Sequence, residues 1–118
     1  MNGRMRYEAG LAAENVVADQ YRDQGYHILA RRWRGRAGEI DIVAKGDHGL
    51  VFIEVKASKT HAQAAQALGY RQQLRLLSAA EEFAGTQPDG LLSHMRVDVA
   101  LMDRSGQVSI LENALMAA

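Results

Sequence analysis

The fold of this chain is decided by the stretch GEIDIVAKGDHGLVFIEVKAS, residues 38–58. Two apolar runs flank the turn-forming GDHG segment, a pattern typical of a β-hairpin. A two-residue loop at residues 47–48 fixes the register and places Ile42 opposite Ile53. One side of the hairpin is then wholly apolar and is expected to face a core; its residues are Ile40, Ile42, Ala44, Val51, Ile53 and Val55.

The other side of the hairpin carries four ionisable residues, with Asp41 opposite Glu54 and Glu39 opposite Lys56. Two carboxylates with Cβ atoms about 5 Å apart repel each other unless a positive group lies between them. Mg²⁺ typically takes one or two carboxylates together with waters and substrate phosphates. Lys56 shares a face with Glu54 and would orient or activate a water, or hold a phosphate. The pattern therefore predicts a metal-dependent site for phosphodiester hydrolysis.

A solvated face is the alternative interpretation, in which Glu39 and Lys56 form a surface ion pair of little energetic value. Two features favour the metal site. The strand LVFIEVK is otherwise too apolar for a sheet edge, and a third acid, Glu14, lies within the apolar stripe of a helix predicted over residues 5–24. If that stripe packs on the sheet, Glu14 reaches the carboxylate pair and binds the metal, directly or through water. Otherwise it is a carboxylate at the rim of the helix.

The chain reads as one α/β domain over residues 1–118, with a mixed β-sheet and the element order α-β-β-β-α-β-β. The predicted helices cover residues 5–24 and a long segment within 59–85, and the predicted strands cover residues 26–33, 39–45, 50–57, 95–102 and 107–111.

Composition excludes several classes of function. The chain has no Cys, so disulfides and Cys-based zinc sites are impossible, which fits a reducing cytosol. No apolar run is long enough for a membrane span, and the start MNGRMRYEAG lacks the apolar core of a secretory signal. We therefore expect a cytoplasmic protein with no membrane partner. Gly-rich nucleotide-binding motifs are absent as well.

Positive charge is concentrated although the net charge is zero. The segment RRWRGR holds four arginines, whose guanidinium groups suit bidentate phosphate contacts, and two more arginines lie on the second predicted helix. The alternative is a solvated edge strand and a polar helix face. The residues predicted to bind nucleic acid are Arg31, Arg32, Arg34, Arg36, Arg71 and Arg75.

The spacing of Asp41 and Glu54-Val55-Lys56 resembles the PD-(D/E)xK nuclease core of the restriction-endonuclease-like fold. That resemblance implies three layers, with helices on both sides of a central mixed sheet. The ordered motifs GLAAE, GY, GEID, FIEVK and RVDV are further similar to the small bacterial YraN-like family, UPF0102, which is related to archaeal Holliday junction resolvases. The similarity covers about residues 6–103 and leaves a C-terminal strand and tail over 104–118.

The resemblance implies a role for each matching residue. Asp41 and Glu54 would hold Mg²⁺ or Mn²⁺, and the backbone carbonyl of Val55 would add a ligand. Lys56 would position the attacking water, and Glu14 would be the helix-borne acid of resolvase-like nucleases.

Three further residues, Glu39, Ser58 and Asp98, are assigned supporting roles. Glu39 lies in the GEID motif, and Asp98 lies in an Arg-x-Asp motif as a structural residue. Ser58 and Arg71 are departures, because the family usually has Arg and Lys at these positions. Both changes would weaken phosphate binding.

Three functions remain open from the sequence. The first is a Mg²⁺-dependent endonuclease that selects DNA by structure rather than by sequence, with branched, Holliday junction-like or flapped DNA as candidate substrates and a homodimer as a candidate assembly. The second is a non-catalytic nucleic-acid-binding module with the same fold. The third is a scaffold for a protein partner. Metal-dependent cleavage separates the first from the second, and salt-sensitive nucleic-acid binding separates both from the third.

Overall fold

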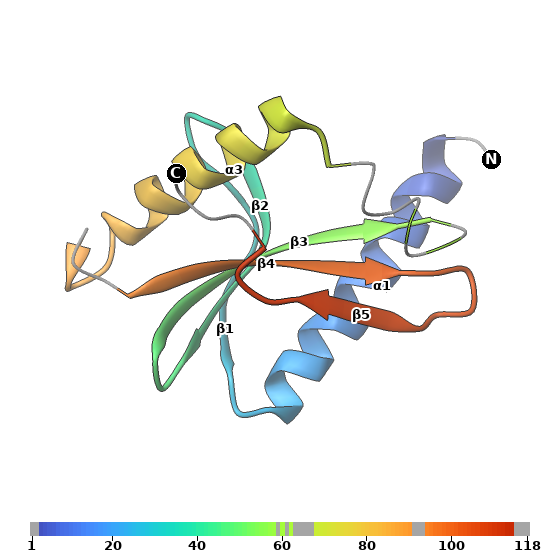
Figure 1. Ribbon diagram of the computed structural model, residues 1–118, viewed down its shortest axis with the longest axis horizontal. Helices are drawn as coiled ribbons and strands as arrows, with labels where there is room; N and C mark the ends of the chain where they lie inside the picture. Colours follow the sequence, from blue (N-terminus) through green and yellow to red (C-terminus); the bar gives the residue numbers. More distant parts are fainter. Residues whose placement is uncertain (1–2, 59, 61, 63–67, 91–93, 115–118) are drawn as a thin grey trace.

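The computed structural model describes residues 3–58, 60, 62, 68–90 and 94–114. Five strands form one sheet in the order β1-β2-β3-β4-β5. Helices α1 (Gly3–Asp23) and α3 (Tyr70–Ala84) cover its opposite faces (Figure 1). The strands are β1 (His27–Arg34), β2 (Glu39–Gly46), β3 (Gly49–Ala57), β4 (Met95–Met102) and β5 (Val108–Leu111). The predicted α/β class, the three layers and the element order are confirmed, and the arrangement is compatible with a restriction-endonuclease-like fold.

The sheet is mixed. Strands β1, β2 and β3 pair antiparallel, β3 and β4 pair parallel through the crossover that contains α3, and β5 returns antiparallel to β4. The predicted hairpin register is confirmed, because Gly46 pairs with Gly49 and Ile42 pairs with Ile53. Gly49 has φ +126°, and a Cβ there would lie 2.3 Å from the carbonyl oxygen of His94, so this turn position requires glycine.

Both faces of the hairpin are buried, each under its own helix. Val17, Ala18 and Tyr21 of α1 pack on a cluster that includes Ile42 and Ile53. The residues of α3 pack on a second cluster; the buried ones are Leu76, Ala79, Ala80, Phe83 and Ala84, and their partners in the sheet include Val43, Leu50, Phe52, Val97, Val99 and Leu101. The side of the hairpin that carries the acids is therefore not a solvated face, because Val43 and Phe52 on the same side pack under α3.

The prediction that Ile40 lies on the same apolar face of the hairpin as Ile42 was wrong. It packs in the cluster under α3, together with Val43, whereas Ile42 packs under α1. Residues 40 and 42 of a regular strand share a face, so the strand changes sides around Asp41. At this point the backbone pairing between β2 and β3 ends, and the Asp41 side chain accepts a hydrogen bond from the β3 backbone instead.

The second helix begins later than predicted. The sequence pattern indicates one helix within residues 59–85, but Leu68 and Gly69 are not helical and α3 begins at Tyr70. Gly69 is the N-cap and has extended dihedral angles, φ −74° and ψ 164°, which end any helix that precedes it. Residues 59, 61 and 63–67 of the predicted helix lie outside the described residues.

The chain returns to the sheet after β5. The backbone N–H of Ala114 donates to the carbonyl of Val97 at 2.8 Å, and the N–H of Asn113 donates to the Asp98 carboxylate at 2.9 Å. Among the described residues, neither helix has the length and apolar character that crossing a membrane requires.

Candidate active site

The candidate site lies where β2 and β3 separate, at the end of the hairpin away from its turn. The pairs between these strands run from Gly46–Gly49 to Ile42–Ile53, while β3 continues beside β4 as far as Ala57. Beyond Ile53, the backbone N–H of Val55 donates to Oδ2 of Asp41 at 2.8 Å. A side-chain carboxylate thus takes the place of a strand carbonyl, which satisfies the N–H and fixes the position of Asp41.

Asp41 and Glu54 are close enough to shift each other's pKa; Asp41 is half-buried and Glu54 is buried. Glu54 is 7% exposed. Burial, and next the charge of Asp41, raise the pKa of Glu54 to about 8, and Lys56 offsets part of this shift. Burial also raises the pKa of Asp41, whereas the hydrogen bond from Val55 lowers it. At neutral pH Glu54 therefore keeps its proton, and a divalent cation that displaced this proton would relieve the repulsion between the two carboxylates.

Lys56 and helix α3 complete the surroundings of Glu54. The Lys56 Nζ atom lies 3.5 Å from Oε1 of Glu54, and Nε2 of Gln72 donates to the same oxygen at 3.3 Å. Beside them opens a cleft of about 320 Å³, which has room for waters and a phosphate group. Its lining residues are Gly38, Glu39, Asp41, Glu54, Gln72, Arg75 and Leu76.

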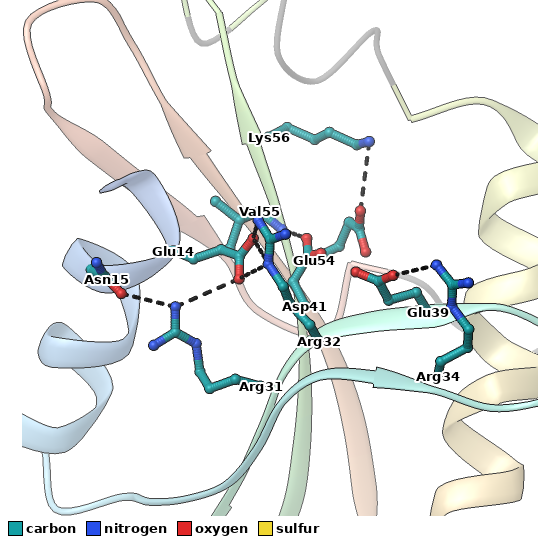
Figure 2. Close-up of polar contacts among 10 residues, drawn as sticks. All are labelled: Glu14, Asn15, Arg31, Arg32, Arg34, Glu39, Asp41, Glu54, Val55 and Lys56. Carbon is teal, nitrogen blue, oxygen red and sulfur yellow. Dashed lines mark hydrogen bonds and ion pairs between the residues drawn. The ribbon is translucent and has the colours of Figure 1, made fainter. Parts of the chain in front are cut away.

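Helix α1 brings the third acid to this place. Glu14 is only 5% exposed, and its negative charge contributes to the raised pKa of Asp41. Nε of Arg32 donates to both Glu14 oxygens at 3.2 and 3.1 Å, and Nη2 donates to Oε2 at 2.8 Å. Figure 2 shows Arg31 and Arg32 converging on Glu14, with Asp41 on the side towards Glu54. Glu14 thus neighbours the carboxylate pair, but both of its oxygens are bonded to arginine.

The arginines of residues 31–36 fall into two groups. Arg31 and Arg32 have side chains that are 30% and 31% exposed, and both form ion pairs with Glu14. The Arg34 side chain is 79% exposed and pairs with Glu39 at 3.2 Å, and Arg36 is exposed as well. A phosphate-binding role therefore fits the second group better than the first.

Helix α3 carries two further exposed arginines, Arg71 and Arg75. Of the two, Arg75 lines the cleft. It is therefore the arginine of α3 placed to meet a phosphate beside the carboxylate pair.

The supporting residues have separate surroundings. Glu39 is exposed at the cleft, and the N–H of Ser58 donates to the carbonyl of Met102 at 3.0 Å. Asp98 is fully buried and accepts hydrogen bonds from the Tyr21 hydroxyl at 2.7 Å and from Nε of Arg96 at 3.0 Å. Burial, followed by Asp98, raises the pKa of Tyr21, so this hydroxyl keeps its proton. Asp98 therefore joins α1 to β4 and, through Asn113, to the C-terminal segment.

One residue of the site, Gln72, was missed from the sequence, and Arg32 was predicted to bind nucleic acid, whereas its guanidinium group bonds Glu14. Gln72 interrupts the apolar stripe of α3 at helical spacing from Leu76 and Ala79, the same signal that identified Glu14 on α1. Arg32 carries no such signal, because its place depends on the backbone of β1 rather than on spacing.

The carboxylate pair suits a small, hard cation. Among the described residues, no three His, Asp or Glu side chains converge on one metal position. Two carboxylates beside an open cleft nevertheless match Mg²⁺, which keeps several waters and completes its shell with substrate phosphate. Asp41 and Glu54 are the residues that fit such an ion, and a ligand role for the Val55 carbonyl stays a prediction.

Fold and site together define a small α/β protein whose mixed sheet opens at one end onto a pair of acids, one buried and one half-buried, and a lysine. The chain belongs to the uncharacterised protein family UPF0102, whose family model matches residues 13–102. A UPF0102 protein of Ruegeria pomeroyi is 52% identical over 95% of this chain and 91% of its own length. One of Cereibacter sphaeroides is 49% identical over 99% of this chain and its full length. The similarity to UPF0102 found in the sequence motifs is thus confirmed.

Proposed function

We propose that this chain is a metal-dependent endonuclease that hydrolyses phosphodiester bonds in DNA. The observation that carries the proposal is the pair of electrostatically coupled carboxyl groups, the half-buried Asp41 and the buried Glu54, at the edge of a cleft, with the Lys56 ammonium 3.5 Å from Glu54. Buried like charges destabilise a fold unless they bind something, and acids with strongly shifted pKa values gather at functional sites. The resemblance to the PD-(D/E)xK core supports the same chemistry.

Each side chain has a defined task in this proposal. Asp41 and Glu54 hold Mg²⁺ or Mn²⁺, which supplies a Lewis acid for the phosphoryl oxygen and lowers the pKa of a bound water. The hydrogen bond from the Val55 N–H already holds the Asp41 carboxylate in place, so little side-chain reorganisation would accompany metal binding. Lys56 orients the attacking water beside Glu54, and Gln72 holds the Glu54 carboxylate in its rotamer. Arg75, on the wall of the cleft, neutralises the phosphate.

The substrate is recognised by its shape and phosphates in this proposal. The exposed arginines available for phosphate contacts are Arg34, Arg36, Arg71 and Arg75. The resemblance to Holliday junction resolvases favours branched or flapped DNA, and a homodimer would place two such sites against two strands. A cytoplasmic location is part of the same proposal.

The test combines metal binding with cleavage. Mg²⁺ and Mn²⁺ are titrated into wild type and the Asp41→Asn/Glu54→Gln double variant, and both proteins are then incubated with linear, flapped and four-way DNA. Wild type is expected to bind metal and cut, and the double variant to do neither. A matched control is Asp19→Asn/Glu81→Gln, which removes two exposed acids and is expected to behave as wild type. Equal cleavage by both site and control variants would reject the proposal.

One observation favours a second candidate, a non-catalytic nucleic-acid-binding module. Glu14 is bonded to Arg32, and Glu54 is paired with Lys56, so two of the three acids have internal cation partners. This candidate predicts DNA binding that weakens steeply with salt and does not change on addition of Mg²⁺.

A further inference from the structure

We infer that Arg32 withholds Glu14 from the cation site, so that the site takes one divalent ion, on Asp41 and Glu54, rather than two. This inference rests on the proposed function, because it concerns the same metal. Glu14 was expected to be a metal ligand. In this inference it is instead the ion-pair partner of Arg32, which holds it away from the metal.

The ion pair between Arg32 and Glu14 uses the whole carboxylate. One guanidinium group donates from Nε to both oxygens and from Nη2 to Oε2, at 2.8–3.2 Å. Such bidentate pairs are the strongest hydrogen-bonded contacts between side chains. Glu14 is 5% exposed, so losing this partner would leave a buried charge with only Arg31, at 3.6 Å, as a counter-ion. A cation would have to break several charge-assisted hydrogen bonds to recruit Glu14.

The backbone of β1 is shaped to make this pair. Successive residues of a strand point to opposite faces, yet Arg31 and Arg32 both reach Glu14, at 3.6 and 2.8 Å. Arg32 has φ +50°, a left-handed conformation that is unfavourable for a residue with a Cβ atom. The register of β1 against β2 also shifts between Ile28 and Ala30. The strand thus leaves regular geometry where it delivers two arginines to one acid, and strain of this kind marks functional positions.

The balance of charge leaves one place for a cation. Glu14 has Arg32 and Arg31, and Glu54 has Lys56, whereas the hydrogen bond to Asp41 comes from the neutral N–H of Val55. Of these three acids, Asp41 alone forms no ion pair among the described contacts, so the place for a cation lies at Asp41, beside Glu54. Cation affinity follows the number of charged ligands in a site, so removing the guanidinium group would add Glu14 to the ligands and strengthen binding.

The test measures Mn²⁺ binding to the full chain by calorimetry and by the resonance signal of free Mn²⁺. Wild type is compared with the charge-neutral double variant Arg32→Met/Glu14→Gln and with the single variants Arg32→Met and Arg32→Gly. Glycine tolerates positive φ, so Arg32→Gly removes the guanidinium group without adding backbone strain. Circular dichroism checks the fold of each variant. Arg22→Met is the matched control, because Arg22 is an exposed arginine of α1, about 12 Å along the helix from Glu14.

Wild type is expected to bind one Mn²⁺, and the double variant to bind one with an affinity within about threefold of wild type. The single Arg32 variants are expected to bind at least about tenfold more tightly, or to take a second ion. Three results would overturn this inference without touching the proposed function. They are two Mn²⁺ ions bound to wild type, a Mn²⁺ affinity of the double variant more than about tenfold below wild type, and single variants with the affinity of wild type. No saturable binding in wild type, or binding that survives Asp41→Asn/Glu54→Gln, would overturn the proposed function as well.

Discussion

The backbone N–H of Val55 donates to the carboxylate of Asp41 at 2.8 Å, and this bond closes the gap where β2 and β3 part. Its geometry gives Asp41 two tasks, one in the fold and one in the site. As an acceptor it satisfies a strand N–H, and as an anion it repels Glu54 and would attract a cation. Substitutions can separate the two tasks.

Asp41→Asn is expected to keep the fold and lose the cation, because an amide oxygen still accepts from Val55 but carries no charge. Asp41→Ala leaves the Val55 N–H without its acceptor and is expected to be less stable than Asp41→Asn by about 1–3 kcal/mol. Urea unfolding without metal measures the difference. Equal stability of the two variants would show that the bond from Val55 contributes nothing to the fold.

The metal-free protein is expected to lose stability as the pH rises through about 8, because Glu54 binds its proton more tightly when folded than when unfolded. Its stabilising contribution is complete below the unfolded pKa of about 4.3 and is lost as the pH passes the folded value. Between pH about 4.3 and about 8 the loss amounts to about 5 kcal/mol. Unfolding curves at several pH values, with and without Mg²⁺, measure it.

Glu54→Gln is the comparison for that pH series, and Glu81→Gln on the exposed side of α3 is its control. The slope of stability against pH should flatten in the first variant and persist in the second. Saturating Mg²⁺ should also flatten it, because the ion replaces the proton. A slope that survives Glu54→Gln would assign the effect to another group.

The network around Asp98 is expected to support stability without affecting the metal site. Tyr21→Phe removes the donor at 2.7 Å and should cost about 1–3 kcal/mol. Asp98→Ala leaves the Arg96 charge with only the exposed Glu112 carboxylate, at 3.8 Å, as a partner and should cost about 3–5 kcal/mol. Tyr70→Phe, at a residue that is 73% exposed, should change stability by less than about 0.5 kcal/mol. Reduced Mn²⁺ affinity in a folded Tyr21→Phe variant would contradict this separation of roles.

The sequence was sufficient to predict the hairpin that carries the site. Alternation along the two strands predicts their register from Gly46–Gly49 to Ile42–Ile53, because a slip by one residue would turn Ile42 and Ile53 to the opposite face of the sheet. The helical spacing of an acid among small apolar residues likewise pointed to Glu14. Such local patterns are determined by the period of one element and need no knowledge of the neighbouring elements.

Contacts that depend on an irregular backbone could not be predicted in this way. The run of arginines in residues 31–36 suggested a nucleic-acid surface, but a left-handed residue at Arg32 turns two of them towards Glu14. The change of side around Asp41 similarly depends on one hydrogen bond from Val55. Tertiary contacts decide both features, and no alternation or spacing in the sequence records them.

Lys56→Met is expected to separate cleavage from cation binding. The ammonium group lies 3.5 Å from Glu54 but is not a ligand of a cation, so the variant should still bind Mn²⁺. Lys56 also lowers the pKa of Glu54, so its removal should move the onset of Mn²⁺ binding to higher pH. Single-turnover cleavage of the preferred DNA should fall by about 10²–10⁴-fold, the usual effect of losing a positioned proton-transfer group.

Lys45→Met is the matched control, since Lys45 is an exposed lysine near the turn end of β2. It should leave both the binding and the cleavage rate unchanged. If Lys56→Met cuts DNA as fast as wild type, Lys56 is only the counter-ion of Glu54, and the water must be oriented by another group. If Lys56→Met instead abolishes Mn²⁺ binding at every pH, Lys56 is needed to assemble the carboxylate pair, and its effect on cleavage says nothing about the chemical step.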